Sequence, residues 1–417
     1  MSAITAKASR KMKKYAVLTR EPRCFLGSFD FSWEQRKLGE IGSVSMCRRI
    51  FKEQTSETGD IPFYKIGTFG ADPDAFISRE LFEEYKSKYP YPQKGDILIS
   101  ASGSIGRAVE FAGNNEYFQD SNIVWLNHDE RLSNPFLKCF YSVVKWAGIE
   151  GSTIKRLYND NILNTVICMP SVPEQKRIGL FFENLDNLIT LHQRKFEKLT
   201  NVKKSMLEKM FPQNGSSYPE IRFKGFTDPW EQRKLSEIAD KVTEKNAGLQ
   251  YVETFTNSAE FGIISQRDFF DHDIAKLGSL DGYYIVKNED FVYNPRISTS
   301  APVGPINRNK LGRTGVMSPL YTVFRPHDVD TTYLEHFFKC AYWHSFMNFN
   351  GDSGARSDRF SIKDDVFFQM PIPLPYIDEQ RKIGELLTRL DHLITLHQRE
   401  LKKLQNIKKS MLEKMFV

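Results

Sequence analysis

The chain has 417 residues, of which 40% are hydrophobic, and a formal net charge of +6 at pH 7. This length suits two or three globular parts rather than one, and the mild positive charge is compatible with a polyanionic partner without identifying one. No uninterrupted apolar run approaches the roughly 18 residues of a membrane-spanning helix, so an integral membrane protein is not expected.

The N-terminus is basic and the cysteines are scattered. Residues 1–28 lack the apolar core and cleavage site of a secretory signal, and we interpret them as a poorly ordered basic leader. Five cysteines without a C-x-x-C pair predict reduced thiols in the cytoplasm, and neither a disulfide framework nor a zinc site. They are Cys24, Cys47, Cys139, Cys168 and Cys340.

A string that begins with tryptophan occurs twice. The sequence WEQRKL at residues 33–38 returns at residues 230–235, an offset of 197. Near-identity at such a distance indicates a duplicated unit of domain size. We expect one globular domain over residues 29–172 and a second over residues 213–375, although their interiors have diverged almost completely.

Both interiors are predicted to mix strands and helices. An acidic turn leads into an apolar strand at residues 95–100 and again at residues 289–294. Short helices are expected over residues 135–147 and 332–346. The fold class is therefore α+β, with two mixed α/β domains in tandem.

The strongest helical signal is also the clearest repeat. Residues 174–211 and 379–416 align without a gap at an offset of 205 and are identical at 25 of 38 positions. Their apolar residues recur at three- and four-residue steps, which places them on one stripe. A rod of about 57 Å, at about 1.5 Å per residue, cannot bury that stripe alone. We therefore predict long helices over residues 173–212 and 376–417 that pair as a coiled coil.

Eight positions, equivalent between the two copies, are predicted to form the pairing face. They are Leu185, Leu188, His192, Leu199, Leu390, Leu393, His397 and Leu404. The two histidines are interpreted as polar residues that fix the register of the pair, and a metal-binding or pH-sensing role is the less favoured alternative.

Four loops rich in serine, glycine and arginine carry the candidate binding residues. They lie at residues 100–107, 151–156, 296–304 and 351–359, two in each domain. Hydroxyls, exposed backbone N–H groups and arginines suit contacts with phosphates and base edges. The predicted DNA-binding residues are Ser100, Ser102, Ser104, Arg107, Lys155, Arg156, Arg296, Ser298, Arg356 and Arg359. Ordinary surface turns with solvated charges are the alternative interpretation.

Motifs for catalysis, cofactors and metals were sought as well. The sequence contains no G-x-x-x-x-G-K-[ST] phosphate loop, no H-E-x-x-H and no paired Cys/His spacing. The Asn-Pro-Arg string at residues 294–296 lacks the second proline and the aromatic residue of amino-group DNA methyltransferases. We therefore predict no catalytic residue, no cofactor and no metal site in this chain.

One nuclease-like pattern is kept as an alternative function. Asp74, Glu84 and Lys86 imitate the PD…ExK arrangement, in which two carboxylates hold Mg²⁺ and a lysine assists the attacking water. The pattern is short and common by chance, and the second domain has no counterpart. Residues 72–74 are read more simply as a turn, and residues 83–84 as a solvated helix face.

The chain resembles the specificity subunit of type I restriction–modification enzymes from about Trp33 onward. The resemblance rests on GDILIS…GSIG at residues 95–106, the proline-led EQKRI segment at residues 170–178, and KSMLEKMF at residues 204–211. It implies that each globular part is a target-recognition domain that reads one half of a split DNA sequence. It also implies that the helices pack antiparallel with pseudo-twofold symmetry, set the length of the unread spacer and dock methyltransferase subunits.

The resemblance further implies a cytoplasmic protein that is not an enzyme on its own. Its implied partners are double-stranded DNA, two methyltransferase subunits and two restriction or translocase subunits. S-adenosylmethionine, ATP and Mg²⁺ would be bound by those subunits. A third interpretation, a coiled-coil interaction protein without DNA, stays open at this point.

Overall fold

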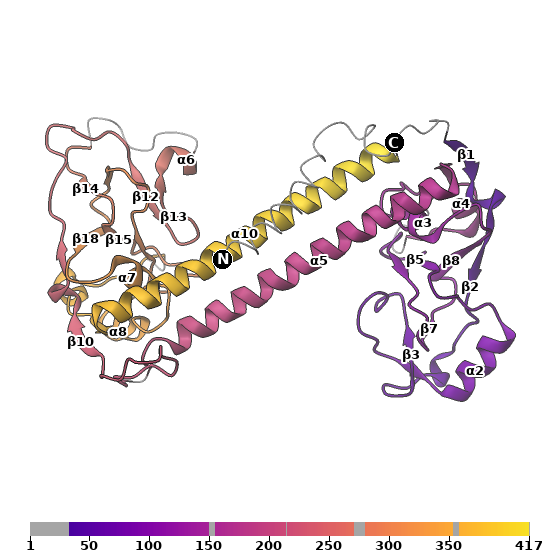
Figure 1. The fold of residues 1–417 in the computed structure, drawn as a ribbon, viewed down its shortest axis with the longest axis horizontal. Helices are drawn as coiled ribbons and strands as arrows, with labels where there is room; N and C mark the ends of the chain where they lie inside the picture. Colours follow the sequence, from indigo (N-terminus) through magenta and orange to yellow (C-terminus); the bar gives the residue numbers. More distant parts are fainter. Residues whose placement is uncertain (1–32, 150–154, 214, 271–279, 353–357, 417) are drawn as a thin grey trace. The chain divides into compact units, whose positions relative to one another are not determined.

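The computed structural model describes residues 33–149, 155–213, 215–270, 280–352 and 358–416. The predicted leader over residues 1–28 lies outside the described residues. The chain divides into two compact units (Figure 1). Unit 1 combines Met1–His192 with Glu400–Val417, and unit 2 is Gln193–Arg399. Each unit therefore contains one globular domain and parts of both long helices.

Unit 1 is built on a four-stranded antiparallel sheet. Its strand order is β2 (Gly42–Met46), β8 (Ile123–His128), β5 (Ile97–Ser100) and β6 (Ala108–Glu110). A separate antiparallel pair joins β1 (Glu34–Lys37), in the Trp-led string, to β9 (Val166–Met169). A second lobe holds β4 (Phe76–Ile77), β3 (Ile61–Tyr64), β7 (Tyr117–Phe118) and α2 (Arg79–Lys88). The short helices α3 (Asn134–Tyr141) and α4 (Asn159–Leu163) complete the domain.

Unit 2 repeats the framework of unit 1. Its four-stranded sheet has the order β11 (Ala239–Lys241), β18 (Thr322–Pro326), β15 (Phe291–Tyr293) and β16 (Ile306–Arg308), and β10 (Glu231–Lys234) pairs with β19 (Pro371–Leu374). The remaining strands differ from those of unit 1. They form the pairs β12 (Phe255–Ser258) with β13 (Gly262–Ser265) and β14 (Tyr284–Val286) with β17 (Gly315–Met317). The short helices are α6 (Gln266–Phe270), α7 (Thr331–Phe337), α8 (His344–Asn350) and α9 (Asp364–Phe367).

The central strands of both sheets are buried on two faces, because successive side chains of a strand point to opposite sides. In β5, Ile97 and Ile99 belong to one apolar cluster and Leu98 belongs to another. In β15, Phe291 and Tyr293 face the cluster that includes parts of the long helices, and Val292 faces the opposite one. Each sheet thus separates a core under the helices from a core in the divergent lobe.

The predicted short helices end earlier than expected. α3 ends at Tyr141 rather than near residue 147, and α7 ends at Phe337, before the separate helix α8. The β-branched pair Val143–Val144 follows the end of α3, and such residues lower helix propensity.

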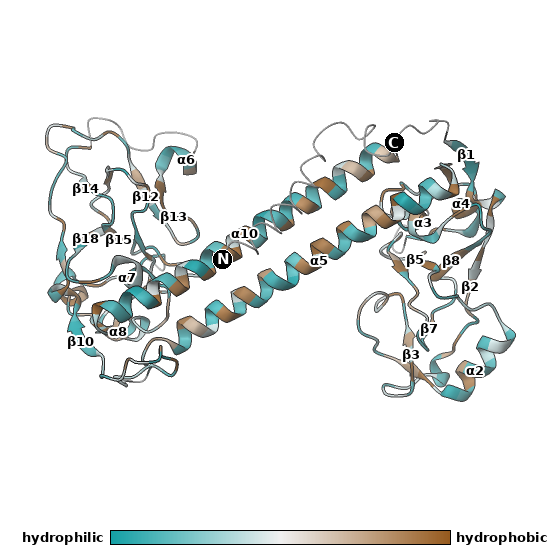
Figure 2. Cartoon of the chain, in the orientation of Figure 1, coloured by the Kyte–Doolittle hydropathy of each residue, from teal (hydrophilic) through white to brown (hydrophobic). Residues whose placement is uncertain are grey.

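Two long helices follow the domains, α5 (Val172–Lys209) and α10 (Ile377–Met415), and hydrophobic and hydrophilic residues alternate along both (Figure 2). A buried glutamine fixes the start of each helix. Gln175 accepts a hydrogen bond from the Ser133 N–H (2.9 Å) and donates to the carbonyl of Pro170 (2.9 Å). Gln380 accepts from the Asp330 N–H (2.9 Å) and donates to the carbonyl of Pro375 (2.8 Å). This bonding explains why the glutamine is repeated.

Gly179 allows α5 to lie directly on α3. A Cβ atom at this position would come within 2.3 Å of the Pro135 Cβ, closer than real Cβ contacts. The equivalent Gly384 of α10 approaches the Tyr333 backbone nitrogen, where a Cβ would lie at 3.1 Å. The glycine in each copy therefore reflects a close approach of helix to domain.

Within each unit, the beginning of one long helix packs with the end of the other. In unit 1, Phe182 and Leu185 of α5 share a core with Leu412 of α10, and Trp33 contacts Phe416 with ring centroids 6.1 Å apart. Lys408 also forms an ion pair with Asp186.

In unit 2 the roles of the helices are exchanged. Leu387 and Leu390 of α10 share a core with Phe211, whose ring lies 6.3 Å from that of Trp230. Lys203 forms an ion pair with Asp391. Each domain is thus completed by both helices. In the part of the chain that the structure describes, no helix is long and apolar enough to cross a membrane.

Candidate nucleic-acid interface

In unit 1 the two predicted binding loops lie side by side. Ser102 and Arg156 form an antiparallel bridge. The Gly103 N–H donates to the carbonyl of Lys155 (3.2 Å), and the Leu157 N–H donates to the carbonyl of Ala101 (2.8 Å). Residues 100–107, which follow β5, and residues 155–157 are therefore joined by backbone hydrogen bonds although they are about fifty residues apart in sequence.

Unit 2 brings its two loops together in the same way. Arg296 and Arg359 form an antiparallel bridge. The Ile297 N–H donates to the carbonyl of Asp358 (3.0 Å), and the Phe360 N–H donates to the carbonyl of Pro295 (2.7 Å). The two units therefore share one arrangement. In unit 1 the loop after β5 pairs with the segment before α4, and in unit 2 the loop after β15 pairs with the segment before α9.

The serines of these loops fall into two groups. Ser100 and Ser102 are buried, with 2% and 4% of their surface exposed. The hydroxyl of Ser100 accepts from the Arg107 N–H (2.9 Å), and that of Ser102 donates to the side-chain oxygen of Asn122 (2.7 Å). These two hydroxyls hold the loop in shape, in contrast to the predicted direct contact with DNA. Ser104 and Ser298 are exposed.

The five predicted basic residues that the structure describes are exposed, and none of them is neutralised by a described carboxylate. The Arg107 guanidinium donates to the carbonyl of Phe69 (2.6 Å), which fixes its direction. Among the described residues, no carboxylate forms an ion pair with Arg107 or with the four cations Lys155, Arg156, Arg296 and Arg359. Arg356 lies outside the described residues. Unpaired cations on a loop are available to a polyanion at little desolvation cost.

A groove of about 360 Å³ adjoins the paired loops of unit 2. Arg359, Tyr321 and Tyr284 line it, together with Lys241, which forms an ion pair with Asp364. The ammonium of Lys245 lies 3.5 Å from the centroid of the Tyr284 ring. Sequence reasoning missed these lysines and tyrosines, because they come from β11, the loop after β11, β14 and the residue before β18, and meet only in the folded domain.

The nuclease-like residues are not arranged as a metal centre. Asp74 pairs with Lys65 (2.9 Å) and Glu84 pairs with Lys88 (3.0 Å), and both carboxylates are more than half exposed. The Lys86 ammonium lies 5.0 Å from the Phe82 ring centroid. Over the described ranges, no group of three or more His, Cys, Asp and Glu side chains could hold a metal ion. The structure therefore does not support the nuclease alternative.

Three cysteines are buried and unreactive. Burial raises the pKa of Cys47, Cys139 and Cys340 to about 12, so that their thiols stay protonated at neutral pH. A protonated thiol is neither a nucleophile nor a good metal ligand. Cys168, which is half-buried, is also a free thiol.

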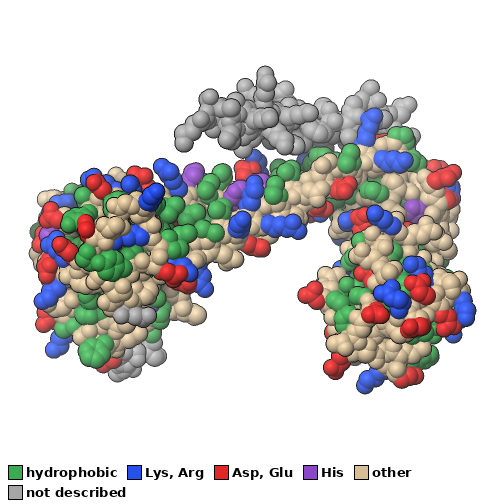
Figure 3. All heavy atoms as spheres, turned by 60° about the horizontal axis from the view of Figure 1, so that its bottom comes forward, with side chains coloured by type: hydrophobic (Ala, Val, Ile, Leu, Met, Phe, Trp, Pro, Cys, Tyr) green, Lys and Arg blue, Asp and Glu red, His purple; other side chains and the backbone are tan. Residues whose placement is uncertain are grey.

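The predicted pairing residues of the helices differ in exposure. Leu185 and Leu390 are buried. The side chains of Leu188, His192, Leu199, His397 and Leu404 are half-buried. Leu393 is 40% exposed, more than a pairing position is expected to be. Figure 3 shows hydrophobic side chains gathered on the surface of the helical part, next to Lys and Arg.

Comparison with protein families matches both units. The family described as "Type I restriction modification DNA specificity domain" matches residues 32–201 and again residues 227–406. Each match covers one globular domain and most of the long helix that follows it.

Two curated proteins are similar in sequence. A putative type I restriction enzyme specificity subunit of Haemophilus influenzae is 60% identical over 158 residues, which are 37% of this chain and 41% of that protein. The chain thus matches about two fifths of this relative's length. The type I restriction enzyme MjaVIII specificity subunit of Methanocaldococcus jannaschii is 24% identical over 333 residues, 76% of this chain and 74% of that protein.

Solved structures are similar in fold, among them the S subunit of a type I restriction-modification system from M. genitalium, with a TM-score of 0.57 and 14% sequence identity. The similarity covers 94% of this chain and 98% of that chain.

Proposed function

Because the chain belongs to the family of type I restriction modification DNA specificity domains, of which it carries two in tandem, we propose that it reads DNA for a type I restriction–modification complex. Each domain reads one half of a bipartite target. The chain itself performs no catalysis, and methyl transfer, translocation and cleavage belong to other subunits. The complex acts on DNA in the cytoplasm.

The observation that carries this proposal is the paired loops. Both domains place two loops of divergent sequence on one shared framework, and both present exposed, unneutralised cations there. Phosphate contacts by such cations would give affinity and orientation, and base-edge contacts would give sequence. Different loop sequences on equal frameworks are what two readers of unlike half-sites require. In unit 1 the contacts are assigned to Ser104, Arg107, Lys155 and Arg156, and in unit 2 to Arg296, Ser298, Arg356 and Arg359.

We further propose that α5 and α10 form one antiparallel coiled coil with pseudo-twofold symmetry. The ion pairs Asp186–Lys408 and Lys203–Asp391 support this arrangement. Asp186 corresponds to Asp391, and Lys203 to Lys408, in the two copies of the repeat. In an antiparallel pair of helices with one register, the numbers of facing residues have a constant sum, and both ion pairs give 594. This register would place the pseudo-dyad between residues 194 and 195 of α5 and between residues 399 and 400 of α10.

The length of the helices suits a split target. A helix of 38 residues is about 57 Å long, at about 1.5 Å per residue. One turn of DNA is about 34–36 Å, so that readers held by such a helix pair could contact half-sites more than one turn apart. The helices would thereby set the number of unread base pairs.

The surfaces of the helices fit partner subunits. Leu180, Leu191, Leu393 and Leu396 are each at least 40% exposed. Exposed apolar side chains rimmed by charges are typical of protein interaction sites. We assign them to contacts with two methyltransferase subunits, which would bring S-adenosylmethionine. Two restriction subunits, which would bind ATP and Mg²⁺, would join the complex through the methyltransferase subunits.

An exchange of recognition regions tests the proposed function. Residues 40–165 are replaced by the corresponding region of a relative with a different target, and methylated adenines are mapped by long-read sequencing in cells that also contain the partner subunits. One half of the recognised sequence should change and the other should stay the same. The matched exchange of residues 240–370 should change only the second half.

Two outcomes would contradict the proposal. If either exchange altered both halves or neither, the domains would not read separate half-sites. If the purified chain alone transferred methyl groups, it would not be a non-catalytic subunit. If the chain were a coiled-coil interaction protein without a DNA function, neither exchange would change the mapped methylation.

A further inference from the structure

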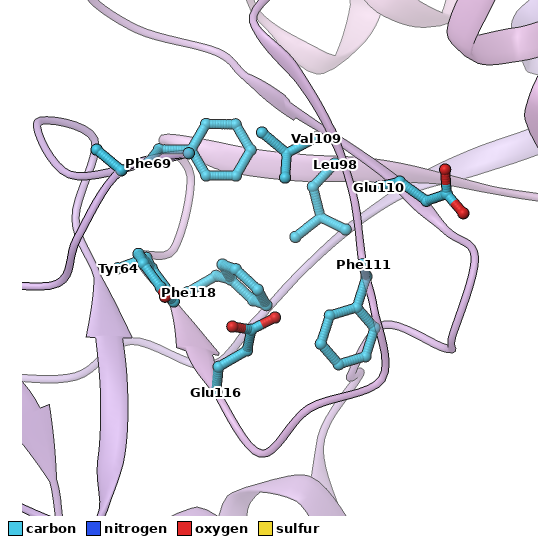
Figure 4. Close-up of a pocket in the computed structure, with 10 residues that line it drawn as sticks. Tyr64, Phe69, Leu98, Val109, Glu110, Phe111, Glu116 and Phe118 are labelled. Atoms are coloured by element: carbon cyan, nitrogen blue, oxygen red, sulfur yellow. The ribbon is translucent and has the colours of Figure 1, made fainter. Parts of the chain in front are cut away.

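The divergent lobe of unit 1 contains a pocket of about 210 Å³ (Figure 4). Four aromatic residues line it, and Leu98 of β5 and Val109 of β6 lie on the opposite side from Phe118. The aromatic residues are Tyr64, Phe69, Phe111 and Phe118. Pockets for drug-sized ligands measure about 300–1,000 Å³, so that this one has room for a single flat ring system.

A carboxylate without a partner lies among these rings. Figure 4 shows the Glu116 carboxylate between Phe118 and Phe111, while the carboxylate of Glu110 is turned away from the rings. Glu110 pairs with Lys138 (3.0 Å), whereas no described side chain donates a hydrogen bond to the Glu116 carboxylate. Burial raises the pKa of Glu116. The Glu116 carboxylate is half-buried beside apolar rings, where a hydrogen bond donated by a ligand is stronger than in water.

The pocket adjoins the predicted binding loop of unit 1. The carbonyl of Phe69 accepts the hydrogen bond from Arg107 (2.6 Å). A Cβ at Gly70, which has a positive φ of 77°, would lie 3.6 Å from the Arg107 Cδ and 3.2 Å from a methyl group of Val109. One wall of the pocket is therefore in contact with the loop over residues 100–107.

We propose that this pocket accepts one extrahelical DNA base, held between the aromatic rings and donating a hydrogen bond from its pairing edge to Glu116. Proteins that take a base out of the duplex hold it between aromatic and apolar side chains and read its pairing edge by hydrogen bonds. An ionised carboxylate only accepts hydrogen bonds, so that Glu116 would accept one from an N–H of the pairing edge: the exocyclic amino group of adenine, cytosine or guanine, or the ring N–H of guanine or thymine. This inference rests on the proposed function, and it adds a second way of reading DNA that unit 1 uses beside its loops.

The proposal is tested with duplexes in which one base at a time faces an abasic site. Such a base needs no unpairing, so that binding should tighten at the position that enters the pocket. The full-length chain, in complex with its methyltransferase subunits, is titrated with duplexes that contain its mapped target. At one position of the half-site read by unit 1, the abasic partner should tighten binding about tenfold or more.

Variants of the two lining glutamates decide whether the pocket is responsible. Glu116→Ala should abolish the gain, and Glu116→Gln should keep part of it, because the amide oxygen still accepts a hydrogen bond. The control Glu110→Gln should leave it unchanged. Since Glu116 is partly exposed, these variants are expected to fold, which thermal unfolding checks.

Three results separate the outcomes. A gain that persists in Glu116→Ala would overturn the proposal, because the base would then enter another site, such as that of the methyltransferase. If the intact target bound normally and no abasic site tightened binding, the proposed role of the pocket would be wrong and the proposed function would stand. Equal binding of all sequences would overturn the proposed function and the pocket together.

Discussion

At the scale of single residues, two sets of arginines in unit 2 differ in their partners. Arg222, Arg308 and Arg325 each donate to a carboxylate that is at most 8% exposed, and they stabilise the fold. Arg296 and Arg359 are exposed, lie opposite each other in a bridge, and have no carboxylate partner among the described residues. This difference in pairing is the reason to expect DNA contacts from the second group.

Arg359→Ala should weaken target binding and relax the sequence preference at one base pair. The loss of a bidentate contact to a guanine edge is expected to cost about 1–3 kcal/mol at that position. Binding is measured with duplexes that carry single base-pair substitutions in the half-site read by unit 2. The matched control Arg313→Ala removes an arginine that is already paired with Glu253 (2.7 Å), and should leave sequence preference intact. An equal loss with every sequence would assign Arg359 to a phosphate.

Glu335 makes the stability of unit 2 depend on pH in the acidic range. Burial alone would raise the pKa of Glu335, but Lys339, Lys310 and Arg308 outweigh it and lower this pKa to about 2. Because the folded pKa lies below the unfolded value, the stabilisation is present above about pH 4.5 and is lost as the pH falls toward 2.

Glu335→Gln should therefore lower the free energy of unfolding at neutral pH by about 3 kcal/mol, since it removes the buried carboxylate that Arg308, Lys310 and Lys339 share. It should also flatten the acid dependence below about pH 4.5, measured by thermal unfolding between pH 3 and pH 7. Glu237→Gln, which removes an exposed partner of Arg233, should cost less than about 1 kcal/mol. Equal losses for the two variants would show that the buried network does not stabilise unit 2.

The positions of these residues could be predicted only in part from the sequence. Turn chemistry located the four loops, because Ser, Gly and Arg after an apolar strand are recognisable locally. The burial of Ser102 could not be predicted, since it depends on Asn122, twenty residues further along the chain. The groove beside Arg359 combines residues from β11, β14 and β18, and no spacing in the sequence links them.

At the scale of elements, the long helices were the most predictable part. Their three- and four-residue apolar steps run without interruption, and duplication supplied a second copy for comparison. The strands β5 and β15 also lie where acidic turns precede apolar runs. The divergent lobes were not predictable in this way, because their strands are two to four residues long and pair with distant segments.

Two leucines of α10 provide a matched test of the helix surfaces. Leu390 is buried at 8% exposure, and Leu393, less than one helical turn away, is 40% exposed. Leu390→Asp should destabilise the protein by about 3 kcal/mol or more, because it places an unpaired charge in the core. Leu393→Asp should leave thermal stability within about 0.5 kcal/mol and reduce co-purification of the methyltransferase subunits. If Leu393→Asp destabilised the fold as strongly, Leu393 would belong to the pairing face.

At the scale of the whole molecule, the two units have one plan. Each has a four-stranded sheet with the same strand order, a paired strand from the Trp-led string, and contributions from both long helices. The sequence indicated this plan through its two repeat offsets. Only the structure shows which end of each helix completes which domain: Phe416 contacts Trp33, and Phe211 contacts Trp230.

The equivalent phenylalanines should therefore affect different domains. Phe211→Ala should destabilise unit 2 by about 3–5 kcal/mol, since the ring is fully buried there. Phe416→Ala should destabilise unit 1, and by less, because its ring is only half-buried. Hydrogen exchange resolved by peptide would locate the loss of protection in each variant. Loss of protection in the same domain for both variants would contradict this assignment.

The sharing of helix ends also affects the order in which the molecule can be finished during synthesis. The first globular domain leaves the ribosome early. Its core includes Leu412 and its Trp33 contacts Phe416, so that these contacts form only after the last residues are translated. The second domain needs only the preceding helix and the first half of its own. The domain that is translated first is thus completed last, and a messenger RNA broken shortly before codon 400 would yield a chain whose second reader is intact and whose first one is unfinished.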